Sequence, residues 1–219
     1  MPVALIAIAG LVVVVFVLWR RWIRLAREAY IRDYVFPRGL FDKLAKRRPE
    51  LALKDRALVA RGLRQFFLAH LRSGRRFVSM PSQVVDDLWH EFILYTKGYD
   101  AFCRAAFGRF LHHTPAAAMA SPTAASDGIK RAWRLACARE NIDPKKPDRL
   151  PRLFVLDSAL LIAGGFIYQL DCLAAGREGA MGSGFCASHI GCGGGCSGDS
   201  GNADSDGGGD GGGGGCGGD

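Results

Sequence analysis

The chain has 219 residues, 49% of them hydrophobic, and a formal net charge of +8. This length allows one domain of ordinary size plus appendages, and the apolar fraction is sufficient for a packed core. The apolar residues are unevenly spread, because residues 2–18 contain no charge and residues 176–219 consist mostly of Gly with Ser and Asp. We therefore expect only the middle of the chain to fold as a globule.

The first segment, residues 2–18, predicts a transmembrane helix. Its length is just enough to cross a hydrocarbon layer of about 30 Å, and Trp19 and Trp22 suit interfacial anchors. No Lys or Arg precedes it and no small-residue cleavage site follows it, which argues against a secretory signal. A buried core helix is the alternative interpretation. Basic residues follow at 20–24, so the positive-inside rule predicts an outer amino terminus and a cytoplasmic domain at the inner or plasma membrane.

These patterns divide the chain into an anchor at 1–19, a helical cytoplasmic domain at 20–175 and a tail at 176–219. Residues 20–76 hold 17 Lys and Arg against 5 Asp and Glu, an excess of 12 positive charges. Such a block beside a membrane anchor predicts contact with anionic lipid headgroups. Nucleic acid ranks well below the membrane as a partner, because no RNA-binding or DNA-binding motif is recognisable. In a reducing cytoplasm the seven cysteines are expected to be thiols or metal ligands.

The first half of the domain shows a succession of helical patterns. Residues 20–36 continue the membrane helix until Pro37 stops it. Residues 54–74 form an amphipathic pattern that ends at Gly74. A further helix opens at Pro81 and, after a break at 96–100, a second one over 100–111 completes a helical hairpin.

The second half of the domain is more broken. We expect a flexible loop at 115–125 and a helix at 128–141 capped by Asp127. Residues 154–170 predict a short helix followed by a strand-like stretch. The glycine-rich tail cannot bury apolar surface and is predicted to be disordered. The fold class is thus mostly α, with an N-terminal transmembrane helix, a small cytoplasmic helical domain and a disordered Gly/Cys-rich tail.

A candidate site begins with Asp86 and His90, which share one face of a helix because they are four residues apart. The carboxylate would orient the imidazole from the second shell. If the next helix folds back, Cys103 and either His112 or His113 reach the same end. These ligand types suit zinc or another transition metal. The alternative is a hydrogen-bonded His90, an inert buried thiol and a solvent-facing pair of histidines.

A second set of ligand types lies in the tail. Its spacings of three, three and four residues resemble an iron–sulfur run with one His in place of Cys, and they also suit zinc: Cys186, His189, Cys192 and Cys196. A Gly-rich tail can also scatter cysteines through composition alone.

Residues 85–115 resemble the signature segment of the glycine-rich domain-containing protein-like family. That segment pairs an Asp-x-x-Trp-His helix with a Tyr-x-x-x-Cys helix and a following His, matched here by Asp86, Trp89, His90, Tyr99, Cys103 and His113. Residues 150–170 and the tail resemble bacterial, membrane-anchored members. The chain departs from the pattern at Phe92, where the family often has a second His. The resemblance implies no particular activity.

Two functions remain open at the level of sequence. The favoured expectation is a non-enzymatic interaction or scaffold module at the inner membrane face, with an unidentified protein partner and a metal site near His90 and Cys103. The alternative is a metal-assisted or thiol enzyme that uses the same two residues. No motif selects a substrate.

Overall fold

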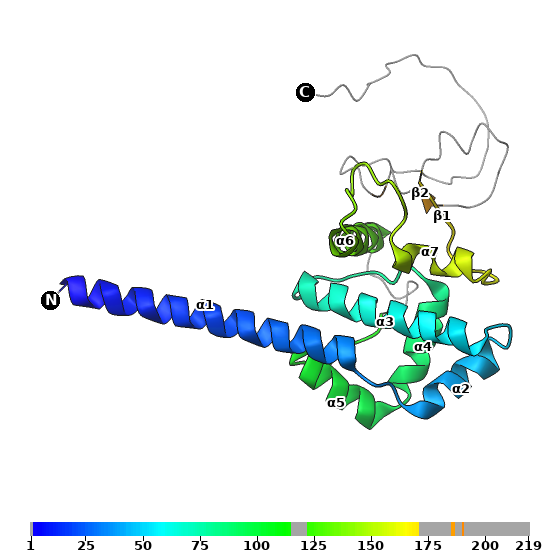
Figure 1. The fold of residues 1–219 in the computed structure, drawn as a ribbon, viewed down its shortest axis with the longest axis horizontal. Helices are drawn as coiled ribbons and strands as arrows, with labels where there is room; N and C mark the ends of the chain where they lie inside the picture. Colours follow the sequence, from blue (N-terminus) through cyan, green and yellow to red (C-terminus); the bar gives the residue numbers. More distant parts are fainter. Residues whose placement is uncertain (1, 115–121, 171–184, 187–189, 191–219) are drawn as a thin grey trace, which may run out of the picture.

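The computed structural model describes residues 2–114, 122–170, 185–186 and 190 (Figure 1). Within them the fold is mostly helical, as predicted, and it contains seven helices: α1 (Pro2–Asp33), α2 (Arg38–Arg47), α3 (Leu53–Ser73), α4 (Gln83–Ile93), α5 (Thr96–Phe107), α6 (Pro122–Glu140) and α7 (Arg152–Ala159). Strand β1 (Tyr168–Gln169) pairs in parallel with β2 (Phe185–Cys186), with Tyr168 opposite Phe185.

Helix α1 is a single rod whose N-terminal part projects away from the other helices (Figure 1). Its apolar part is long enough to cross a membrane by length and composition, and none of that window is buried in the domain. The predicted continuation of this helix through the basic residues after Trp19 is confirmed, and the helix ends at Asp33, before Pro37. Burial begins at Glu28 and Ile31, where α1 enters the core.

Helix α3 lies at the centre of the domain and packs against α1, α2, α4, α6 and α7. Arg72 binds Glu28 and Arg64 donates to the carbonyl of Tyr34, so α3 runs antiparallel to α1. Gly62 lets α4 and α7 approach closely, since an added Cβ would lie 2.5 Å from Leu156 and 2.9 Å from Val85. The predicted end signal at Gly74 is confirmed, with φ of +72°.

The core beside α3 is built largely of aromatic rings contributed by three helices. Phe67 of α3 contacts Trp89 and Phe92 of α4 and Phe102 of α5, with ring centroids 4.9 to 6.4 Å apart. Such offset and edge-to-face pairs stabilise a core beyond the area that they bury. They fix the spacing between α4 and α5, on which the candidate site depends.

Helix α2 is an element that the sequence analysis does not predict. Its two buried residues, Leu40 and Leu44, give only a narrow apolar stripe in a ten-residue helix. Charge pairs hold it against α4, because the buried Asp87 accepts from Arg48 at 2.8 Å and pairs with Arg47 at 3.1 Å. Tertiary ion pairing rather than a wide hydrophobic face therefore stabilises this helix.

The predicted hairpin of two helices is present as α4 and α5, but the break between them lies elsewhere. Residues 96–100 are helical, and the chain turns at Leu94 and Tyr95 instead. Ser82 caps the start of α4 by accepting from the backbone N–H of Val85. Gly108, at φ +72°, ends α5 in the left-handed conformation that favours glycine.

The predicted loop at 115–125 is wrong for its second half. Residues 115–121 lie outside the described part of the chain, whereas Pro122 begins α6. Proline is tolerated in the first turn of a helix, where its missing N–H has no intrahelical partner. Asp127 consequently lies inside α6 and does not cap it. The predicted short helix and strand-like stretch over 154–170 match α7 and β1. The prediction for 176–219 falls mostly outside the described residues.

Asp157 of α7 connects the end of the domain to the start of α4. Its buried carboxylate accepts four hydrogen bonds, from the hydroxyl of Ser82 at 2.7 Å and the backbone N–H groups of Gln83, Val84 and Phe166 at 2.6, 3.2 and 2.9 Å. A carboxylate at a helix N-terminus satisfies unpaired N–H groups and interacts favourably with the helix dipole. This contact sets the position from which α4 presents its side chains.

Candidate metal centre

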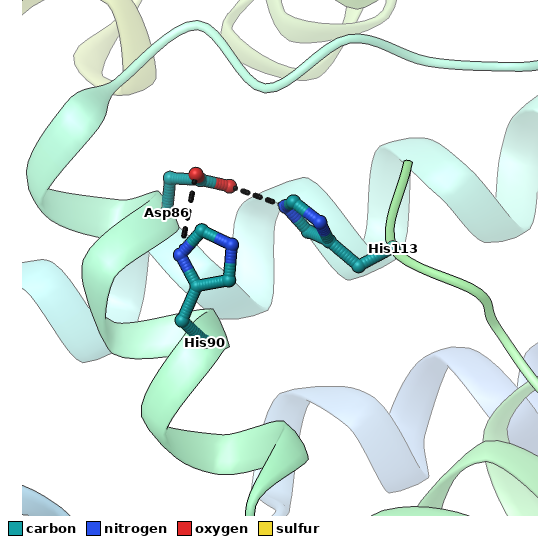
Figure 2. A group of neighbouring side chains, drawn as sticks. All are labelled: Asp86, His90 and His113. Atoms are coloured by element: carbon teal, nitrogen blue, oxygen red, sulfur yellow. Dashed lines mark hydrogen bonds and ion pairs between the residues drawn. The ribbon is translucent and has the colours of Figure 1, made fainter. Parts of the chain in front are cut away.

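Three side chains meet at the outer face of α4 (Figure 2). Asp86 and His90 lie one turn apart on the helix, and both point toward His113 from the segment that follows α5. Asp86 Oδ2 lies 3.5 Å from His90 Nδ1, and Asp86 Oδ1 lies 3.0 Å from His113 Nε2. One ligand atom from each residue falls within 4.8 Å of the other two. A single cation could therefore reach all three.

The segment that carries His113 is held by a hydrogen-bonded chain in the core. The Tyr99 hydroxyl donates to the carbonyl of Leu111 at 2.6 Å and accepts from Trp89 Nε1 at 3.1 Å. Leu111 is buried, His112 is exposed and His113 is partly buried, which is the alternation of an extended chain. The Trp89 ring also packs edge-on against His113, with centroids 4.6 Å apart. His113 is thus fixed by neighbours that are themselves buried.

The group is open to solvent on one side. The exposed fractions of the side chains are 13% for His113, 20% for Asp86 and 38% for His90. The two imidazole rings lie against each other, with centroids 4.3 Å apart. Two imidazoles and one carboxylate form a ligand set used for zinc and for other divalent transition metals. Three protein ligands would leave coordination positions free for water or another molecule.

Cys103 and His112, two of the residues predicted for this site, are not part of the group. Cys103 is buried beside the Tyr99 hydroxyl and the backbone of Leu111, and burial raises the pKa of its thiol. It lies one helical turn after Tyr99, so it shares the core-facing side of α5. His112 is exposed and its ring packs near Phe110, with centroids 4.8 Å apart.

The sequence predicts only an orienting role for Asp86, whereas its two carboxylate oxygens face two different imidazoles. Helical spacing reveals the contact with His90 but not the one with His113, which depends on the path of the chain after α5. In the tail set, Cys186 belongs to β2, while His189, Cys192 and Cys196 lie outside the described residues. The tail metal site therefore stays a prediction.

Comparison with known families corrects the resemblance drawn from residues 85–115. A family model described as UCP032817-like matches residues 26–190, three quarters of the chain, and the glycine-rich domain family is not supported. The residues behind the mistaken resemblance include Trp89, Tyr99 and Cys103, which pack or hydrogen-bond inside a helical hairpin. Searches among curated proteins and among solved structures found no match.

Proposed function

The chain belongs to the UCP032817-like family, and we propose that it is a membrane-anchored helical module that binds a divalent transition metal of the zinc class. The observation that carries this proposal is the convergence of Asp86, His90 and His113. The module presents this site on the domain that follows α1.

The ligand chemistry supports a metal at this position. Carboxylate and neutral imidazole are the forms that bind metal near neutral pH. The Trp89 ring packs against His113, and the Tyr99 hydroxyl holds the chain two residues earlier by donating to the carbonyl of Leu111. Groups that position a ligand typically change metal affinity by about 10-fold to 100-fold when removed. The site thus combines suitable ligands with a rigid support.

Membrane anchoring by α1 is supported by its uncharged apolar stretch and by the aromatic and basic residues that follow. Trp19 and Trp22 suit the interface, and Arg20, Arg21 and Arg24 favour a cytoplasmic side for everything after them. We place the amino terminus outside and the domain at the inner face of a cell membrane. Its role there is to bind another protein as a scaffold or interaction module.

A metal-assisted enzyme is the second candidate function. It is favoured by the small number of protein ligands, because a metal with open positions can bind and polarise water or a substrate. The thiol variant of this idea lacks support, since Cys103 is buried and burial raises its pKa, which keeps the thiol protonated.

The test is metal analysis of the full chain, purified in detergent without chelator. Cys186→Ser, Cys192→Ser, Cys196→Ser and Cys216→Ser together form the background, so that the tail cannot contribute thiolate ligands. We expect about one equivalent of zinc in this background and its loss in His113→Ala. His112→Ala is the matched control, because it removes an exposed imidazole one residue away. Zinc retained by His113→Ala, or absent from the folded parent, would sink the proposal.

The scaffold and the enzyme differ in the coordination sphere of the bound metal. Cobalt substituted for zinc gives a visible spectrum that changes when a small anion such as azide enters an open position. A spectral response to azide would support the enzyme. An unchanged spectrum would mean that the metal has no open coordination position, which would support the scaffold.

A further inference from the structure

The end of the domain nearest the apolar part of α1 can be identified from contacts alone. Along α1 the contacts of α3 run from Arg72 opposite Glu28 to Arg64 opposite Tyr34. Those of α5 run in the same sense, from Gly108 against Arg27 to Phe102 against Tyr34. Both helices are therefore antiparallel to α1. The residues just after them, 74–76 and 108–110, lie at the end from which α1 projects (Figure 1).

This end lies close to the level at which a membrane surface would run. A helix rises 1.5 Å per residue, so Arg27, five positions after Trp22, lies about 7.5 Å farther along the helix axis. The polar layer of each leaflet is about 5 to 7 Å thick outside the hydrocarbon core. If Trp22 marks the interface, the domain begins where the headgroups end.

The same end carries a ring of arginines without acidic partners in the described part of the chain. These are Arg24 and Arg27 of α1, Arg75 and Arg76 after α3, and Arg109 after α5. Glu28, the acid that follows Arg27 on α1, is already paired with Arg72.

Contacts within the protein already hold the arginine-bearing segments together. The side chain of Arg109 donates to the carbonyl of Gly74 at 3.1 Å, which joins the ends of α3 and α5. The guanidinium of Arg27 lies against Gly108, where an added Cβ would meet it at 2.5 Å. Three segments that are distant in sequence are thereby held on one surface.

We infer that this group of arginines, Arg24, Arg27, Arg75, Arg76 and Arg109, which we call the arginine ring, docks the domain onto the anionic headgroups of the membrane that α1 crosses. The inference rests on the proposed membrane span and goes beyond it, because a span alone leaves the domain free to tilt. Positive charges that face a lipid surface within a Debye length attract anionic headgroups. From this end the chain returns along α5 to Leu111, so His113 lies farther from the membrane than the ring.

The test uses hydrogen exchange, read by mass spectrometry, on the full chain in two kinds of vesicle. One kind contains phosphatidylcholine alone, and the other contains added phosphatidylglycerol. We expect phosphatidylglycerol to slow exchange several-fold at residues 74–77 and 108–110. Residues 52–56, at the opposite end of α3, should exchange equally in both.

Charge reversal provides the matched variants. Arg75→Glu with Arg76→Glu should abolish the slowing, whereas Lys54→Glu with Arg61→Glu, on the remote part of α3, should keep it. All four residues are exposed, so both variants should melt at the wild-type temperature. Equal exchange in the two lipids, or slowing that survives Arg75→Glu with Arg76→Glu, would overturn the inference.

An alkaline wash of the same vesicles separates this inference from the span. A chain that is stripped off by the wash refutes the membrane span, and the docking with it. A chain that stays in the vesicles but shows equal exchange refutes the docking alone.

Discussion

Asp86 and Asp87 are neighbours on α4, yet they face opposite environments. Asp87 is almost completely buried and paired with two arginines of the α2 end, and Glu91 one turn later also contacts Arg47. Asp86 remains 20% exposed, and its close partners are two imidazoles. A carboxylate neutralised by guanidinium groups holds two helices together. One that faces neutral or titratable nitrogens remains available to a cation.

The largest expected loss of stability comes from removing Asp87, the buried member of the pair. Asp87→Ala removes the buried carboxylate that accepts from Nε of Arg48, in a site where the arginine is only 17% exposed. We expect the free energy of unfolding to fall by about 3 kcal/mol, as for buried pairs that lose one partner. Urea unfolding followed by circular dichroism measures this loss. Asp86→Ala is the control and should cost less than about 1 kcal/mol. Equal losses would mean that the two faces do not differ in role.

His70 on α3 provides a third environment to compare with those of Asp86 and Asp87, because it is a buried imidazole whose effect on stability appears at acid pH. Burial, with a smaller contribution from Arg109, lowers its pKa to about 4, and its Nε2 has no hydrogen-bond partner among the residues that the structure describes. The unfolded chain binds the proton near pH 6.5, so stability is lost as pH falls from 6.5 toward 4. We expect a loss of about 3 kcal/mol from this group in the metal-free protein. His70→Leu should flatten this part of the pH profile of urea unfolding, and an unchanged profile would contradict the assignment.

The segment that carries His113 can be loosened without changing any of the three candidate metal ligands. Tyr99→Phe removes the hydroxyl that donates to Leu111 and accepts from Trp89. We expect a loss of about 2 kcal/mol in unfolding free energy, because a buried donor and acceptor become unpaired. Zinc affinity, measured by chelator competition, should fall about tenfold. Unchanged affinity would show that His113 does not depend on this chain of bonds.

The smallest effect is expected at Cys103. Cys103→Ser should cost about 1 kcal/mol, because it buries a more polar group beside Tyr99 and Leu111. Zinc content by plasma mass spectrometry should not change, since the thiol does not belong to the outer face. A folded Cys103→Ser variant without zinc would return this residue to the ligand set.

The sequence predicts the long helices well because their apolar patterns are wide and their ends carry Gly or Pro. It fails for α2, where the decisive interactions are ion pairs to Asp87 from residues in another helix. It also fails at Pro122, because proline both ends and begins helices. Local pattern therefore predicts elements whose stabilising contacts are periodic and apolar.

The candidate site was predictable only where its contacts follow helical periodicity. Helical spacing joins Asp86 to His90, but the choice between His112 and His113 depends on an extended segment. The apolar Leu111 could have decided between them. In an extended chain side chains alternate, so a buried Leu111 implies that His113 faces the same side and His112 the other. Cys103 could not be excluded from spacing alone, since the spacing does not show which side of α5 faces the core.

The bonds of Asp157 have a consequence for the order in which the protein is made. The start of α4 is completed by a carboxylate that is translated 75 residues after Ser82. Because the ribosome releases the chain from its amino terminus, α1, α2 and α3 emerge long before Asp157 exists. The corner that carries Asp86, His90 and His113 therefore matures late in synthesis. Fragments that stop before α7 would expose the unsatisfied N–H groups of α4 to quality-control proteases.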